Sequence, residues 1–328
     1  MEEQKYLFEV IKTKIGAKDN LVYKVMELLN LSINPAYRRI RGEQILTFAE
    51  LLSLCKAYNL SLDEICNMSG KQGVLFSYAP VNFAEKGSYE AYIKRLAGSL
   101  AYYKSEKIEM SITAQDIPFF YFLDFPELMF FKLYAWNDTI TRPQLSYEDF
   151  CKNLDKNTIL PFYREMANSW QHIPSREIWT NQTLDTILRL LEYYDEIGAF
   201  ENQETVTMLL NQLLELMSNV KKCANDGFKG GELKTPSLLY LCHVDFENNF
   251  MLIKRGEKMS CTIRLFTVNS LLTHHKFLCT ETVKWIEDLI YKSVLISETS
   301  AKERSLFFRS SNTKIEMVID KIAKMKKA

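Results

Sequence analysis

The first 66 residues of this 328-residue chain divide into short apolar patterns of helical period. This division constrains the fold more than any other feature, because residues that recur every three or four positions mark the buried face of a helix. The predicted helices cover residues 3–15, 21–29, about 34–40, about 47–58 and 61–65. Helices this short are stable only when packed together. We therefore expect a compact five-helix domain at residues 1–70, ending near a glycine-containing linker at 69–73.

The turn after the second predicted helix carries strong backbone signals. Asn30 stands where a left-handed backbone is expected, and asparagine tolerates that conformation best after glycine. Ser32 or Asn34 can cap the next helix, and Pro35 is accepted only in its first turn. Gly42 suits the position just after a helix C-terminus. These signals bound the third predicted helix at both ends.

The segment from residue 21 to residue 65 resembles a Cro/CI-type (xenobiotic-response-element family) helix-turn-helix domain. The resemblance lies in Leu-Val-Tyr-Lys-Val-Met-Glu-Leu-Leu at 21–29, Tyr-Arg-Arg-Ile-Arg-Gly at 37–42 and Leu-Ser-Leu-Asp-Glu-Ile at 60–65. These parts follow the family's order of helix, tight turn, recognition helix, Arg-Gly stop, long helix and short helix. The resemblance covers about a fifth of the chain. It implies sequence-specific binding of double-stranded DNA, with the helix at about 34–40 in the major groove.

The resemblance also assigns roles to individual side chains. The candidates for contacts with base edges are Asn34, Tyr37 and Arg38. The candidates for contacts with phosphates are Lys24, Arg39 and Arg41. Arginine pairs bidentately with guanine and asparagine with adenine, whereas phosphate contacts position the protein without specifying a sequence. One departure is that family members often carry an apolar residue where Arg39 stands and an acidic residue where Ile40 stands.

The charge of the chain is balanced overall but not locally. Lysine plus arginine and aspartate plus glutamate each number 41, so bulk charge does not attract nucleic acid. Residues 12–41, however, hold seven basic and two acidic residues, a net charge of +5. Residues 1–70 as a whole balance at nine basic and nine acidic residues. That balance leaves open an alternative function, a helical protein-interaction adaptor whose helix-turn-helix core no longer binds DNA.

Beyond the linker we expect two further regions. Residues 76–230 are predicted to form a helical dimerisation or regulatory region, with one strand near 108–113 and about four helices over 145–227. Residues 231–328 are predicted to form an α+β region, in which an antiparallel meander at 237–244, 249–254 and 260–268 precedes the terminal helices. The expected fold class is therefore mainly α, with a small sheet near the end.

Two segments of this larger part have unusual composition. The stretch 116–136 holds nine aromatic residues, which suit a core helix with its lead-in, a pocket for an apolar effector, or a dimer seam. Residues 302–328 hold eight basic and three acidic residues, and 145–217 hold five basic and twelve acidic residues. The basic end is expected to form a solvated face, to contact phosphates, or to bind an acidic surface such as the 145–217 segment of a partner subunit.

Motifs for metal binding and catalysis are weak. The seven cysteines are scattered without a Cys-x-x-Cys pair, and the groups at 242–243, 261, 274–275 and 279 lack a second closely spaced ligand pair. Neither the glycines at 70–73 nor those at 227–231 match a phosphate-binding loop. We therefore expect no enzyme, no metal and no cofactor.

The sequence as a whole indicates a cytoplasmic DNA-binding transcriptional regulator. No basic region leads into an apolar stretch at the N-terminus, and no window of about 18 residues stays apolar and uncharged, so we expect neither a signal peptide nor a membrane span. The expected partners are duplex DNA and a second copy of the chain, since two half-sites multiply affinity. A small-molecule or protein effector is a further candidate partner.

Overall fold

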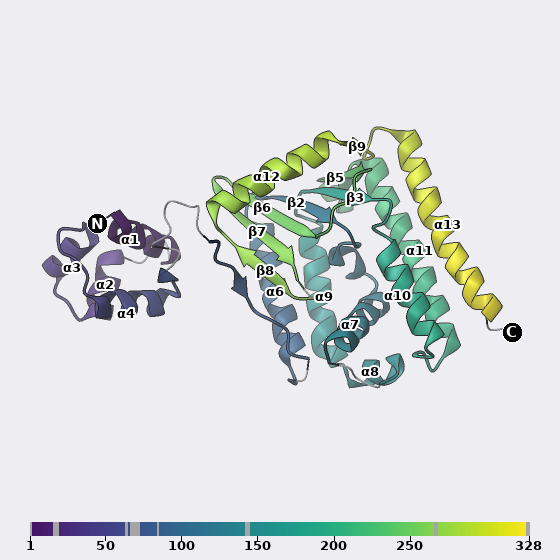
Figure 1. The fold of residues 1–328 in the computed structure, drawn as a ribbon, viewed down its shortest axis with the longest axis horizontal. Coiled ribbons are helices and arrows are strands. Elements are labelled where there is room, and N and C mark those ends of the chain that lie inside the picture. Colours follow the sequence, from purple (N-terminus) through teal and green to yellow (C-terminus); the bar gives the residue numbers. More distant parts are fainter. Residues whose placement is uncertain are drawn as a thin grey trace. The chain divides into compact units, whose positions relative to one another are not determined.

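The computed structural model describes residues 2–15, 20–62, 65, 73–83, 85–141, 145–265 and 268–325. The chain divides into two compact units, Met1–Leu75 and Phe76–Ala328 (Figure 1). The regions 76–230 and 231–328 that the sequence separates belong to one unit. Most of the predicted linker lies outside the described residues.

The N-terminal unit is helical and confirms four predicted helices. In chain order they are α1 (Glu2–Lys14), α2 (Leu21–Leu29), α3 (Ile33–Ile40) and α4 (Phe48–Tyr58). Most of the fifth predicted helix lies outside the described residues. Buried apolar side chains from every one of these helices meet in one core: Leu7, Phe8, Ile11, Val22, Val25, Ala36, Leu54, Cys55 and Ile65.

Local capping groups explain where these helices begin and end. Asn20 caps α2 by accepting a hydrogen bond from the Val22 N–H. Asn30 ends the same helix in the left-handed conformation, with φ 51° and ψ 50°. Thr47 and Glu50 form a reciprocal capping box at the start of α4. The left-handed turn predicted from the sequence is confirmed.

The second unit alternates helices with strands. Its elements before the middle of the chain are β1 (Ser77–Tyr78), α6 (Ser88–Ser105), β2 (Glu109–Ala114), the 3₁₀ helix η1 (Phe119–Phe122), α7 (Pro126–Thr141), α8 (Tyr147–Asn153) and α9 (Lys156–Trp170). They are followed by β3 (Ser175–Thr180), α10 (Asp185–Glu196), α11 (Gln203–Asp226), β4 (Phe228–Lys229), η2 (Gly231–Leu233) and β5 (Thr235–Cys242). The remaining elements are β6 (Phe250–Arg255), β7 (Lys258–Arg264), β8 (Ser270–Thr273), α12 (Lys276–Tyr291), β9 (Ser293–Leu295) and α13 (Ala301–Met325).

The prediction of a mainly α fold with a small terminal sheet is wrong. The described strands form one nine-stranded mixed sheet of order β1-β8-β7-β6-β2-β3-β5-β4, with β9 paired to β5. The central strands β2, β3 and β5 are parallel to one another, and the helices between them make the crossover connections that parallel pairing requires. The fold of this unit is therefore α/β.

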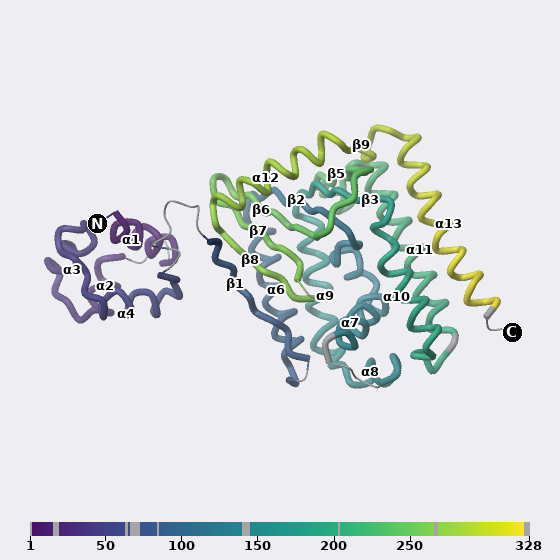
Figure 2. The backbone as a smooth tube through the Cα atoms, in the orientation of Figure 1, coloured from purple at the N-terminus to yellow at the C-terminus, as the bar shows by residue number. Residues whose placement is uncertain are grey.

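The sheet also corrects the predicted meander. Of the three strands predicted to form it, only β6 and β7 pair with each other, and β8 extends this antiparallel arrangement. Strand β5 instead lies beside β3, and β6 crosses the sheet to pair with β2 (Figure 2). The predicted strand near 108–113 is confirmed as β2, whereas β3 lies within a segment predicted to hold only helices. Pairing between distant segments leaves no local trace in the sequence, so periodicity alone could not order these strands.

Strand β3 was not predicted because two charged residues, Arg176 and Glu177, interrupt its apolar pattern. Glu177 is buried there, and its carboxylate accepts hydrogen bonds from the Tyr121 hydroxyl at 2.8 Å and the Trp179 indole at 3.1 Å. Lys229 on β4 is also buried, and its ammonium group donates to the Ser175 hydroxyl at 2.9 Å. These contacts satisfy polar groups that are rare inside a sheet. Burial raises the pKa of Glu177 and lowers the pKa of Lys229 to about 7.

Helices cover both faces of the sheet (Figure 1). Helix α12 covers one face and packs through Cys279, Ile286 and Leu289. The other face carries the larger core, to which α6, α7, α9, α10, α11 and α13 contribute. The aromatic stretch forms η1 and α7 within this core, and rings such as Phe122 and Phe131 have no exposed surface. The interpretation of this stretch as a core helix with its lead-in is confirmed.

The basic C-terminal helix pairs with acidic groups of its own chain. Lys314 on α13 lies 2.6 Å from Asp185, and Lys321 lies 3.1 Å from Glu192 and 2.9 Å from Glu196. All three carboxylates belong to α10, within the acidic segment noted in the sequence. Within the described part of the chain, no helix is both long enough and apolar enough to cross a membrane.

Candidate nucleic-acid interface

Helix α3 presents one polar stripe to solvent. Asn34, Tyr37, Arg38 and Arg41 are exposed and stand at spacings of three, four and seven residues, which places them on one face of a helix. The Arg41 guanidinium lies over the Tyr37 ring, 5.3 Å from its centroid. All three side chains predicted to contact bases therefore share an exposed face with one predicted phosphate contact.

Arg39 points the other way. Its side chain is 9% exposed, and its guanidinium forms an ion pair of 2.8 Å with Glu50. Partial burial would raise the pKa of the Glu50 carboxyl, but hydrogen bonds from Arg39 and Thr47 outweigh burial and lower that pKa. The Gln4 side-chain amide adds a hydrogen bond of 2.6 Å to the Arg39 carbonyl. The structure thus makes Arg39 part of the domain's packing and does not bring it together with the other predicted phosphate contacts.

The remaining predicted phosphate contacts are exposed. Lys24 lies on the surface of α2. Arg41 follows α3, and its guanidinium lies 3.5 Å from the Glu43 carboxylate. The Arg41 side chain is 63% exposed and the Glu43 side chain 50% exposed. Such an exposed ion pair contributes little stability, so its arginine is readily recruited by another anion.

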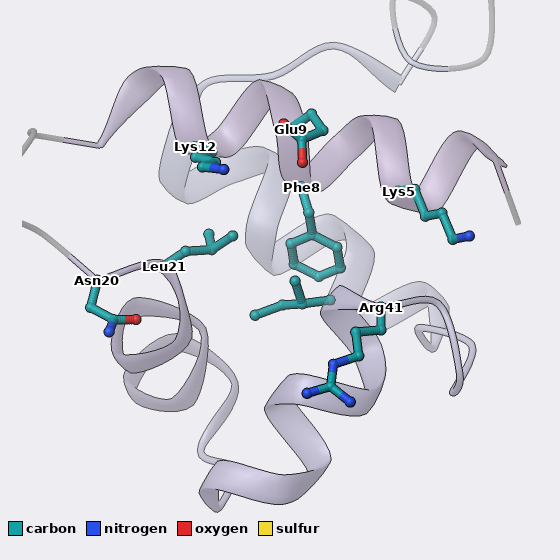
Figure 3. Close-up of a pocket in the computed structure, with 8 residues that line it drawn as sticks. Lys5, Phe8, Glu9, Lys12, Asn20, Leu21 and Arg41 are labelled. Carbon is teal, nitrogen blue, oxygen red and sulfur yellow. The ribbon is translucent and has the colours of Figure 1, made fainter.

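The packing of α1 adds two cations that sequence reasoning did not assign to the interface. An open cleft of about 750 Å³ lies among α1, the start of α2 and the end of α3. Figure 3 shows Lys5, Lys12 and Arg41 around the apolar side chains of this cleft, with Glu9 as the one acidic lining residue. The N-terminus of α2 also borders it and carries a partial positive charge. The cleft therefore has the charge that suits a phosphate.

Not every basic residue of the 12–41 segment contributes to this surface. The Lys14 ammonium group donates to the carbonyls of Tyr58 and Asn59 at the end of α4, at 3.1 Å each. Lys18 lies outside the described residues. The basic residues at positions 12, 24, 38 and 41 are thus exposed to solvent. Those at positions 14 and 39 bond to other parts of the domain.

The metal-capable groups noted in the sequence do not come together within the described residues. Those residues contain no cluster of three or more histidine, cysteine, aspartate or glutamate side chains able to hold a metal. The cysteines at the metal-capable positions of the sequence, Cys242, Cys261 and Cys279, are buried in the core beneath α12. In comparisons with known proteins, no family model, no curated protein and no solved structure matches the chain.

Proposed function

We propose that the chain is a sequence-specific DNA-binding transcriptional regulator that acts in the cytoplasm and inserts α3 into the major groove. The observation that carries this proposal is the exposed stripe of Asn34, Tyr37, Arg38 and Arg41, on a helix without a carboxylate. Arg38 supplies a bidentate donor for guanine, and Asn34 matches the donor and acceptor of adenine. Exposed arginine, tyrosine and asparagine side chains on a short rigid helix are suited to reading base edges.

Phosphate contacts follow from the surrounding cations. Lys24 is exposed on α2, and Arg41 is exposed at the end of α3. Lys5 and Lys12 extend the positive surface onto α1. Each phosphate neutralised by such a cation releases counterions, which contributes affinity that falls with salt. This proposal leaves Arg39 out of the DNA contacts, because its guanidinium is already paired with Glu50.

We further propose that the regulator works as a homodimer through residues 76–328. One helix-turn-helix module covers little DNA, and two linked modules gain affinity through effective concentration. A dimer would read two half-sites separated by about one helical turn of DNA.

A second candidate function is supported by exposed apolar residues near α4. Ile45 is 71% exposed and Phe48, three residues later, is 70% exposed, which is unusual for two apolar side chains of this size so close in the chain. They favour a helical adaptor that binds protein through this surface. The two proposals differ in which residues matter: the arginines of α3 for DNA, or Ile45 and Phe48 for a protein.

The test is the salt dependence of binding to a fluorescent duplex of mixed sequence, followed by anisotropy. The DNA proposal predicts saturable binding at low salt and a logarithmic slope of about −3.6 to −5.4, since about four to six phosphates are neutralised. Replacing Ile45 and Phe48 by serine should leave that slope unchanged. If the folded protein binds no duplex at about 50 mM salt, where such contacts are strongest, the regulator proposal fails.

A further inference from the structure

A small cavity lies beside the glycine-rich turn at 227–231, within the larger unit. It has a volume of about 60 Å³ and is bordered by η1, the end of α9, α11, β4 and β5. One water molecule needs about 10–15 Å³ of such space, so the cavity has room for a molecule of a few non-hydrogen atoms. Asp124 and Asn219 on its border are exposed, whereas Trp170 and Lys229 are buried. The cavity therefore reaches from the surface to side chains of the core.

The glycine-rich turn positions Lys229 at this cavity. Lys229 lies on β4 between Gly227 and Gly230, whose φ angles of 74° and 78° are left-handed. A Cβ atom at Gly230 would lie 2.7 Å from the Gln171 carbonyl oxygen, so only glycine lets the turn pack this closely against the end of α9. The backbone thus fixes the place from which the buried lysine side chain reaches the cavity.

A single hydroxyl connects the Lys229 amino group to a buried carboxyl group. The Lys229 nitrogen lies 2.9 Å from the Ser175 hydroxyl and 2.9 Å from the centroid of the Trp170 ring. The Ser175 hydroxyl in turn donates to the Glu177 carboxylate at 3.1 Å. Burial outweighs the attraction of Glu177 and lowers the pKa of Lys229 to about 7, so about half of these side chains carry a free amine at neutral pH.

The other titratable groups at the cavity leave Lys229 as its nucleophile. Burial raises the pKa of the Cys223 thiol and of the Tyr121 hydroxyl, so both stay protonated at neutral pH. Among the described residues that line the cavity, Asp124 is the one carboxylic acid and Lys229 is the one basic residue. With Asp124 on the border and Glu177 behind Ser175, an uncharged molecule fits better than an anion.

We propose that Lys229 is a covalent binding site for a small uncharged aldehyde of about two or three carbon atoms, which it holds as an imine. A free lysine amine is a nucleophile toward a carbonyl carbon, whereas an exposed lysine is almost entirely protonated at neutral pH and lacks the lone pair that this reaction needs. The inference goes beyond DNA binding and does not depend on it.

The reaction is a condensation that releases one water. The Lys229 nitrogen attacks the carbonyl carbon, and a C–N bond forms while the π electrons of the carbonyl move to its oxygen. Two protons then pass from the nitrogen to this oxygen, the C–O bond breaks, and the oxygen leaves as water. Ser175 and Glu177 relay these protons and end unchanged. Burial raises the pKa of Glu177, which suits a group that takes up and returns a proton near neutral pH.

The probe for the test is acetaldehyde with sodium cyanoborohydride, which reduces an imine to a stable ethyl-lysine that peptide mass spectrometry locates. At about pH 7 we expect Lys229 to be ethylated at least about tenfold faster than the exposed Lys302, because about half of its amine is free, against less than about 0.1% for an ordinary lysine. Benzaldehyde, whose ring exceeds the cavity, should label Lys229 no faster than Lys302. Ethylation of Lys229 no faster than that of Lys302 would overturn the proposal.

A variant at the border tests the route into the cavity. Asn219 is exposed on α11, so N219W covers the border without changing the buried side chains. The matched control is S218W, at an exposed neighbouring position that does not line the cavity. N219W should slow ethylation of Lys229 at least about fivefold relative to S218W, and circular dichroism verifies that both variants are folded. Equal ethylation in the two folded variants, or equal labelling of Lys229 by acetaldehyde and benzaldehyde, would overturn the assignment of this cavity.

Discussion

The Arg39 guanidinium and the Glu50 carboxylate form an ion pair of 2.8 Å that joins α3 to the first turn of α4. Glu50 also accepts a hydrogen bond of 2.8 Å from the Thr47 N–H and so completes the capping box of α4. Because of this pair, the Arg39 side chain points into the domain, whereas those of Arg38 and Arg41 point to solvent. One stabilises the domain, and the other two are exposed for a ligand.

Breaking this pair should destabilise the N-terminal unit. Arg39→Ala leaves the partly buried Glu50 carboxylate without its charged donor, which typically costs about 1.5 kcal/mol. Arg38→Ala is the matched control and should change the free energy of unfolding by less than about 0.5 kcal/mol, since Arg38 is exposed. The measurement is urea unfolding followed by circular dichroism, which reports the helices.

The distribution of tryptophan gives this experiment an internal reference. All four tryptophans lie in the second unit, so their fluorescence reports that unit alone. Arg39→Ala should move to lower urea the part of the helical signal that the N-terminal unit contributes, and leave the tryptophan transition in place. Equal stability of Arg39→Ala and Arg38→Ala would show that the ion pair contributes nothing.

The two exposed arginines should have different effects on DNA binding. Arg38→Ala should cost about 1–3 kcal/mol of affinity and relax specificity at one base pair, as expected for a base contact. Arg41→Ala should weaken all sequences alike and reduce the salt slope by about one, as expected for a phosphate contact. Anisotropy titrations at several salt concentrations distinguish the two, with R309A as the charge-matched control on α13. Unchanged affinity in both variants would refute the assignment of this surface.

The left-handed residue Asn30 should be sensitive to its replacement. Asn30→Ala forces a residue with a Cβ and no compensating polar group into φ 51°, which costs about 1 kcal/mol. Asn30→Gly should be neutral or slightly stabilising, because glycine adopts this conformation freely. Both variants are compared by the same urea unfolding. A loss that is as large for glycine as for alanine would mean that the side chain, and not the backbone, matters here.

The buried Lys229 should make the second unit more stable at alkaline pH. Its pKa is about 7, below the ordinary 10.5, because burial outweighs the attraction of Glu177. Between pH 7 and 10.5 the unfolded chain binds a proton that the folded chain has released, so this contribution to stability rises with pH. Below pH 7 both states hold the proton and the contribution is lost.

Lys229→Met removes this titration. Relative to the variant, the wild type should gain up to about 1.4 kcal/mol of stability per pH unit above neutrality. Urea unfolding followed by tryptophan fluorescence between pH 6 and about 9.5 measures the difference. Both proteins carry Glu177→Gln, because this carboxyl interacts with Lys229, and subtracting the variant then cancels the other titrating groups. Parallel stability profiles for the two proteins would contradict a depressed pKa at Lys229.

Local chemistry explains how much of the N-terminal unit could be predicted. The ends of α2 and α3 follow from Asn20, Asn30 and Gly42, whose backbone preferences act over a few residues. The inward direction of Arg39 was not predicted, because an arginine on a recognition helix is expected to face DNA. A signal was present in the sequence, since the helix-turn-helix domains that this segment resembles often have an apolar residue at the position of Arg39. Lys5 and Lys12 could not be assigned, because only the packing of α1 brings them to the cleft.

The second unit was less predictable because its order depends on pairing between distant segments. The strand β2 was predicted from its alternating pattern, but β3 was missed because Arg176 and Glu177 interrupt its apolar character. Glu177 is tolerated there because the Tyr121 hydroxyl reaches it from η1 and the Lys229 charge from β4, in addition to donors on its own strand. Such compensation exists only after folding.

The central claim, that the exposed stripe of α3 reads a DNA sequence, is tested most directly by selecting bound sites from a pool of random duplexes. We expect the wild-type protein to enrich a defined motif, and Arg38→Ala to lose the preference at one position of that motif while keeping the rest. A folded wild-type protein that enriches no sequence above the starting pool, or an Arg38→Ala variant that selects an identical motif, would contradict it.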